Sequence, residues 1–161
     1  GEPRPESSRG ATAGQAREWP DTAILEDNGL SVVSGASYDG LFTMLSRHRF
    51  DYMPRSVVEI WDEAAAHRSQ GIMVDQNIAL YYPAAVYFFV NHKDQVLADA
   101  LTTGLEAAIA DGKFDQLFYR YFAGVIEQAR LNQRRTIVLV NRSLPASAPL
   151  TRKELWIIYP K

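Results

Sequence analysis

The 161-residue chain contains no cysteine, and this absence excludes several kinds of chemistry. There is no disulfide framework, no zinc finger and no thiol nucleophile. The three histidines, His48, His67 and His92, are 19 and 25 residues apart, so no two of them have the spacing of a helical metal-binding pair. We therefore expect no metal site and no bound cofactor, and we expect His67 and His92 to face water near helix ends.

An excess of charge of one sign is also missing. The chain has 17 Lys and Arg against 19 Asp and Glu, and this balance argues against a nucleic-acid partner. The halves differ, with 7 basic and 12 acidic side chains in residues 1–80, and 10 basic and 7 acidic in residues 81–161. Many of the later basic residues lie between Arg130 and Arg142, which we interpret as a solvated surface rather than an anion-binding site.

Long hydrophobic runs are absent as well. The apolar stretch from Tyr81 to Val90 has about half of the length that a membrane helix needs. Residues 1–9 hold no large apolar side chain, so we expect a disordered leader or an expression remnant there, and not a signal peptide. Hydrophobic residues make up 47% of the chain, which is enough to form the buried core of one domain, or of one domain and a fragment.

Between residues 10 and 75, short apolar runs alternate with helical periodicity. Three helices are predicted. The first begins near Pro20, the second begins at Ser37 or Asp39, and the third spans residues 57–67. The predicted strands are residues 11–14, 30–33, 50–53 and 72–74. Strands and helices that alternate with short connections indicate an α/β fold with parallel pairing and right-handed crossovers. We expect Gly14, Gly35 and Pro54 at the turns.

The second half has a different pattern. Val86–Val90 is predicted to be a strand, and Asp94 is predicted to cap a long helix that breaks at Asp111-Gly112. A second amphipathic helix should cover residues 114–125, followed by short strands at residues 136–140 and 155–158. We therefore divide the chain into a βα ligand-binding lobe, residues 10–80, and a cross-over strand with two helices and a C-terminal extension, residues 81–161.

Known catalytic and nucleotide-binding motifs are lacking. The chain has no Gly-x-Ser-x-Gly elbow, no Gly-x-Gly-x-x-Gly fingerprint and no Walker A loop. The adjacent carboxylates Asp62 and Glu63 should point in different directions on a helix. No motif therefore favours an enzyme.

The turns that follow the predicted strands carry the candidate ligand-binding residues. Strand C-termini converge on one crevice in an open parallel sheet, where helix N-termini also face a ligand. Trp19 or Tyr38 would stack on the ligand, and Arg55 would take a carboxylate. Alternatively, Trp19 packs on the helix that it precedes and Arg55 pairs with Glu59. The candidate ligand-binding residues are Trp19, Asp21, Thr22, Ser37, Tyr38, Arg55 and Glu59.

The order of these segments resembles the second lobe of type II bacterial extracytoplasmic solute-binding proteins, family 3, which includes polar amino-acid receptors of ABC importers. In that family a helix ends in Leu-x-x-Gly-Arg-x-Asp before a strand, and the segment from Leu41 to Tyr52 is similar. The stretch from Tyr82 to Asn91, then Leu101 to Tyr121 with Asp111-Gly112 between its helices, is similar to a later part of the family. The resemblance covers roughly residues 10–125.

The resemblance implies a parallel βα sandwich lobe of the type II periplasmic-binding-protein-like fold, with C-terminal helices and short late strands. It implies a periplasmic or extracytoplasmic protein that binds a small solute without chemistry and delivers it to a membrane permease. Two departures matter: almost nothing precedes Gly10 where the family has a first lobe, and Pro54-Arg55-Ser56 stands where amino-acid receptors often carry an aspartate. The second departure suggests an anionic or uncharged solute rather than an α-amino acid.

Two other classes of function remain open. Relatives on this fold dehydrate small acids, and Glu59 beside Arg55 would then be the acid/base. A sensory or interaction domain would instead use the basic segment Arg130–Arg142 to contact a partner. The missing lobe also leaves the apolar faces of the second half without a partner, so we expect self-association, for example by strand exchange.

Overall fold

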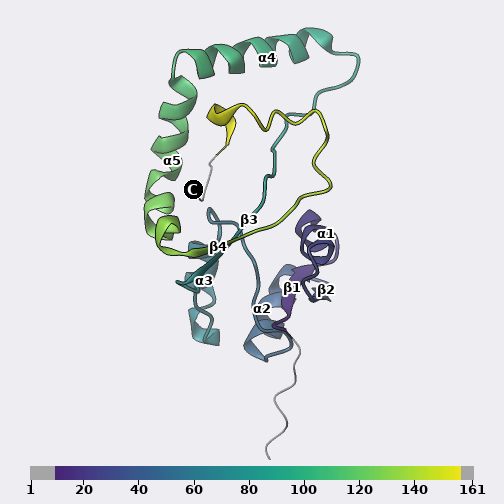
Figure 1. The fold of residues 1–161 in the computed structure, drawn as a ribbon, viewed down its shortest axis with the longest axis vertical. Helices are drawn as coiled ribbons and strands as arrows, with labels where there is room; N and C mark the ends of the chain where they lie inside the picture. Colours follow the sequence, from purple (N-terminus) through teal and green to yellow (C-terminus); the bar gives the residue numbers. More distant parts are fainter. Residues whose placement is uncertain (1–9, 157–161) are drawn as a thin grey trace, which may run out of the picture. The chain divides into compact units, whose positions relative to one another are not determined.

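The computed structural model describes residues 10–156 of a mixed α/β chain (Figure 1). It separates into two compact units, residues 10–76 with 138–143, and residues 77–137 with 144–156. The division expected after residue 80 therefore falls at residue 76, and the short segment 138–143 belongs to the first unit. The units are described separately below.

The first unit is built on parallel pairing around one central strand. Strand β1 (Ala13–Ala16) pairs in parallel with β2 (Val32–Gly35), with Ala13 opposite Val32 and Ala16 opposite Gly35. On the other side of β1, Tyr52 forms a parallel bridge to Ala13, and the Gly14 amide donates to the Tyr52 carbonyl at 2.8 Å. The predicted parallel arrangement of the first three extended segments is confirmed.

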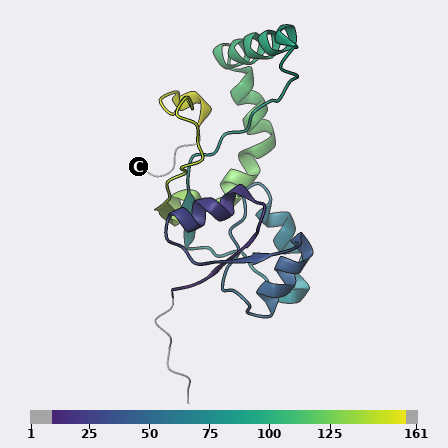
Figure 2. The same cartoon turned by 90° about the vertical axis from the view of Figure 1, so that its right-hand side faces the viewer.

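Helices α1 (Pro20–Asp27) and α2 (Tyr38–Ser46) lie on opposite sides of these strands (Figures 1 and 2). Both begin where the sequence predicts. Proline occupies the first turn of α1, and the Ser37 hydroxyl accepts from the Gly40 amide at the start of α2. Each strand end is therefore followed within a few residues by a helix start, as a ligand crevice requires.

The core on the α2 side joins Ala16, Leu41 and Phe50, each at most 2% exposed. Gly14 was expected at a turn but lies inside β1, opposite Val33. It makes this packing possible, because a Cβ atom at that position would lie 2.1 Å from the Phe50 ring. The chain from 138 to 143 completes the unit. There, Leu139 is buried and Asn28 exchanges two hydrogen bonds with the Val140 backbone, at 2.8 and 2.9 Å.

The region after Pro54 differs from its prediction. Helix α3 spans Ile60–Ala66 instead of residues 57–67, and a 3-10 turn, η1 (Arg68–Gln70), follows it. The predicted strand at residues 72–74 does not form. The chain instead turns at Gly71, whose φ of +76° is in the left-handed region, and the next strand is β3 (Ile78–Tyr81).

The second unit pairs β3 with β4 (Arg135–Val138), and the Arg135 amide donates to the Asn77 carbonyl at 2.7 Å. Helix α4 (Gln95–Ala110) is capped as predicted by Asp94, which accepts from the Leu97 amide. Helix α5 (Lys113–Ala129) follows the predicted break, where Gly112 has a φ of +79°. The two helices meet at a corner (Figure 1). Short 3-10 turns are η2 (Leu131–Gln133) and η3 (Lys153–Leu155).

Three predictions for the second half need correction or limits. Val86–Val90 is extended but belongs to no strand, because it has no partner among the described residues. The strand predicted at residues 136–140 forms as Arg135–Val138. The one predicted at 155–158 lies partly outside the described residues, and Leu155 itself ends a 3-10 turn. Within residues 10–156, no helix is long and apolar enough to cross a membrane.

Candidate functional site

The turns after the three parallel segments meet around Arg55. Arg55 follows Pro54 at the end of the segment that pairs with β1, and its guanidinium carbon lies 4.5 Å from the centre of the Trp19 ring. The Tyr38 ring, from the start of α2, is 5.8 Å from the same carbon. Both distances are within the range of cation–π attraction. The expected convergence of Trp19, Tyr38 and Arg55 is therefore present in the structure.

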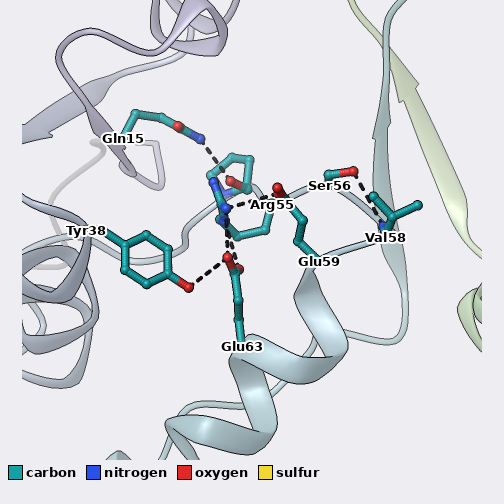
Figure 3. Close-up of polar contacts among 8 residues, drawn as sticks. Gln15, Tyr38, Arg55, Ser56, Val58, Glu59 and Glu63 are labelled. Carbon is teal, nitrogen blue, oxygen red and sulfur yellow. Dashed lines mark hydrogen bonds and ion pairs between the residues drawn. The ribbon is translucent and has the colours of Figure 1, made fainter. Parts of the chain in front are cut away.

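Two glutamates hold the guanidinium in place (Figure 3). Arg55 Nε donates to Glu63 Oε2 at 2.8 Å and Nη2 donates to Glu63 Oε1 at 2.7 Å, which is a bidentate pair. Nη2 also donates to Glu59 Oε2 at 3.0 Å. The Arg55 and Glu63 side chains are only 14% and 12% exposed, whereas Glu59 is 50% exposed. The pair with Glu59 matches the alternative that the sequence had left open.

The protonation states of this cluster are fixed at neutral pH. Burial alone would raise the pKa of Glu63, but hydrogen bonds from Arg55 and Tyr38 outweigh it and hold the pKa below its ordinary value. The hydrogen bonds from Arg55 to Glu63 raise the pKa of Arg55. Loss of solvent and the 2.8 Å hydrogen bond to Glu63 raise the pKa of Tyr38 to about 12. Glu63 is therefore a carboxylate, and Arg55 and Tyr38 keep their protons.

Behind Arg55, Gln15 ties β1 to the same turn. Its Nε2 donates to the Pro54 carbonyl at 2.9 Å, and the residue is 1% exposed. This bond fixes the amide so that Oε1 is buried and has no donor among the described residues. Figure 3 shows Gln15 on the side of Arg55 opposite to Glu63. The turn that carries Arg55 is thereby anchored to the central strand.

The Tyr38 ring packs against a pair of stacked rings, Phe42 and His67. Tyr38 meets Phe42 edge to face at 5.0 Å, and Phe42 stacks on the His67 ring at 3.7 Å with an angle of 8° between the planes. His67 does end α3, as expected, but it is only partly exposed because its ring covers Phe42. The expectation that His67 faces water is therefore wrong.

The remaining candidate residues serve the starts of the helices. The Thr22 hydroxyl donates to the Ala16 carbonyl at 2.8 Å and is buried, and the Ser37 hydroxyl caps α2. Asp21 lies in the first turn of α1. The donors of Arg55 go to the glutamates rather than to α1. The structure thus gathers Trp19, Tyr38, Arg55 and Glu59 at one point, while Thr22 and Ser37 have local backbone partners.

Glu63 is the central residue that the sequence did not single out. The sequence predicts only that the adjacent carboxylates of Asp62 and Glu63 point in different directions. In the structure, Glu63 is the one that binds Arg55. The available signal was the spacing of four residues between Glu59 and Glu63, which places both on the same side of a helix. Arg55 lies four residues before Glu59, so the three charged residues 55, 59 and 63 follow one another at intervals of four.

The other candidates have structural roles or no supporting geometry. Arg134, within the basic segment Arg130–Arg142, donates from Nε to the Ala129 carbonyl at 2.6 Å, and so satisfies the last turn of α5. In the part of the chain that the structure describes, no cluster of three His, Asp or Glu side chains is suited to a metal ion.

Compared with known proteins, the chain matches no protein-family model, no curated protein and no solved structure. The likeness to solute-binding proteins therefore rests on the sequence motifs alone. What the molecule does must be inferred from Arg55 and the groups around it.

Proposed function

We propose that this chain is the solute-binding component, or part of one, of an ABC-type importer. In this proposal the cluster around Arg55 binds a small polar solute without changing it chemically. The resemblance in sequence adds a periplasmic or extracytoplasmic location and a membrane permease as partner. The observation that carries the proposal is an oriented guanidinium at the ends of parallel strands, with one nitrogen left over for a ligand.

That nitrogen is Nη1 of Arg55. Glu59 and Glu63 take the donors of Nε and Nη2, and no described residue accepts from Nη1. The bidentate pair and the contact with Trp19 hold the planar group in one orientation, which lowers the entropy cost of binding an acceptor. No described residue donates to Glu59 Oε1 either, and Tyr38 is 41% exposed. A small solute would thus find a donor, an acceptor and an apolar ring.

The charge balance favours a polar solute without net negative charge. One guanidinium faces two carboxylates, so the cluster carries a net charge of about −1. An anion bound to Nη1 of Arg55 would lie close to the carboxylate of Glu59, and the two negative charges would repel each other. Of the two solute classes considered from the sequence, the uncharged one is therefore the better supported.

Acid/base chemistry has less support than binding. Glu63 donates no proton at neutral pH because hydrogen bonds from Arg55 and Tyr38 stabilise its charged form, and a general acid needs a pKa near the working pH. Glu59 is half-exposed and bound to Arg55 through one oxygen. A lyase would need a second group to protonate the leaving oxygen, and the hydroxyl of Tyr38, the candidate beside Arg55, already donates its proton to Glu63.

A thermal-shift panel with the full chain tests the proposal. The panel contains polyols, amides, zwitterions and dicarboxylates, each over a range of concentrations. A bound solute at about 100 times its Kd stabilises the fold by about 2.7 kcal/mol, a rise of roughly 5–10 °C in Tm for a chain of this size. We expect the rise with an uncharged polar solute, and NMR of the solute should show it unchanged.

Two matched arginine variants locate the site. Arg55→Lys removes the planar fork and should weaken binding by tenfold or more. Arg49→Lys, at an exposed arginine of the same unit, should leave binding unchanged. A solute that is consumed would indicate an enzyme, and a panel with no shift at all would leave the binding proposal without support.

A further inference from the structure

The segment Ala84–Val90 of the second unit pairs with no other strand in the described part of the chain. It connects β3 to α4, and none of its amides or carbonyls forms a backbone hydrogen bond with the described residues. Its large side chains are exposed, with Val86 at 100%, Phe88 at 71% and Phe89 at 95%. Seven residues therefore present free hydrogen-bonding groups and apolar side chains together.

The composition of this segment is that of a central strand. Ala84–Val90 contains no proline, no glycine and no charge, and five of its seven residues are β-branched or aromatic. Apolar residues follow one another instead of alternating with polar ones, as in strands that are covered on both faces. Proteins normally protect such an edge with charges or bulges, and here the first charge is at Lys93.

The helices of the same unit are also largely exposed to solvent. No residue of α4 is buried, and Ala129 alone is buried in α5. A shallow apolar groove runs along α5, lined by Phe114, Leu117, Phe118, Tyr121 and Phe122. The second unit therefore exposes two apolar features, the segment Ala84–Val90 and the groove along α5.

The exposed area is close to what a stable dimer needs. At about 150–250 Å² for a whole aromatic side chain, the exposed parts of Tyr87, Phe88 and Phe89 amount to about 400 Å² per chain. With Val86, which is fully exposed, the segment offers about 500 Å² per chain, so two copies would bury about 1,000 Å² in total, the lower limit for a specific interface.

We infer that Ala84–Val90 pairs antiparallel with the same segment of a second copy of this chain, across a two-fold axis at Tyr87. In this register the seven residues overlap over their full length, with Val86 opposite Phe88 of the second copy. Every side chain in the paired region is uncharged, so no like charges meet. A two-fold contact uses the same surface twice, so the segments of both copies are covered at once.

Cysteine cross-linking tests this register, because the chain has no cysteine of its own. A disulfide needs two Cβ atoms in close contact, and in this register Tyr87 is the only position that lies opposite its own copy. Under mild oxidation, Tyr87→Cys should form a covalent dimer. Ala84→Cys and Val90→Cys should not cross-link alone, but the double variant should. Equal cross-linking at positions 84, 87 and 90 would overturn the antiparallel register.

The mass in solution tests the association itself. Light scattering over a dilution series should show a dimer, and Phe88→Arg should raise its dissociation constant by at least tenfold. Met73→Arg, at an apolar residue of the first unit that is 82% exposed, is the matched control and should leave the constant unchanged. A circular dichroism spectrum checks that both variants fold. A monomer at every concentration, or unlimited aggregation, would overturn the inference.

Discussion

The carboxylate of Glu63 accepts two hydrogen bonds from the guanidinium of Arg55, from Nε at 2.8 Å and from Nη2 at 2.7 Å. Both side chains are largely buried. This pair joins the turn after the third parallel segment to helix α3. It also decides which donors of Arg55 are used inside the protein and which are left for a solute. The proposed binding site therefore depends on Glu63 as much as on Arg55.

Glu63→Gln should destabilise the fold. The substitution keeps the size of the side chain, but the amide accepts through one oxygen only and its NH2 is itself a donor, so one charge-assisted hydrogen bond from Arg55 is lost, at a cost of about 1.5–3 kcal/mol. Urea denaturation monitored by circular dichroism measures the change in the free energy of unfolding. Glu26→Gln, on the exposed face of α1, is the control and should cost less than about 0.5 kcal/mol. Equal effects of the two substitutions would contradict the importance of the pair.

The stability that Glu63 provides should depend on pH in a defined direction. Its pKa is lower in the folded chain than its ordinary value of 4.5, so this stability is fully present above pH 4.5 and is lost as pH falls through the folded-state value. The difference in unfolding free energy between wild type and Glu63→Gln should therefore shrink as the pH is lowered from neutral. A difference that stays constant down to the acid transition would show that the carboxylate charge is not involved.

Tyr38 should ionise later than an ordinary tyrosine. Its hydroxyl donates to Glu63, and its pKa is raised from 10.0 to about 12. The chain has eight tyrosines, so the signal is the difference in phenolate absorbance between wild type and Tyr38→Phe during an alkaline titration. We expect that difference to titrate near pH 12. Titration near pH 10 would mean that the hydroxyl does not donate to a carboxylate in solution.

Gly14→Ala should strain the core beneath the site. The new methyl group would lie 2.1 Å from the Phe50 ring, so either β1 or the ring must move, at a cost of about 1–3 kcal/mol. Gly10→Ala is the matched control, because no atom lies within 4 Å of a Cβ at that position. Thermal unfolding of both variants should show a loss of stability only for Gly14→Ala.

The helix starts and breaks could be predicted because their causes are local. Pro20 at the first turn of α1, the Ser37 cap of α2, the Asp94 cap of α4 and the break at Gly112 each involve residues within four positions of one another. The strands could not be predicted as well. The apolar segments 72–74 and 86–90 look like strands in sequence, but a strand exists only when another segment pairs with it.

The candidate site was predicted in part for the same reason. Parallel topology alone places Trp19, Tyr38 and Arg55 at one edge, so their meeting could be expected from the order of the elements. The choice of Glu63 as the main partner depends on where α3 begins. Residues 57–59 remain outside the helix, and this late start determines which glutamate reaches Nε of Arg55.

The most direct test of solute binding uses two of the three tryptophans, Trp19 and Trp156, as reporters. In a two-dimensional ¹H–¹⁵N spectrum of the full chain, the stabilising solute should shift the indole resonance of Trp19, whose ring lies under Arg55. The indole of Trp156, which donates to the Pro149 carbonyl in the second unit, should stay in place. In Arg55→Lys the Trp19 shift should require at least tenfold more solute. Shifts confined to Trp156, or a Trp19 shift unaffected by Arg55→Lys, would contradict binding at this site.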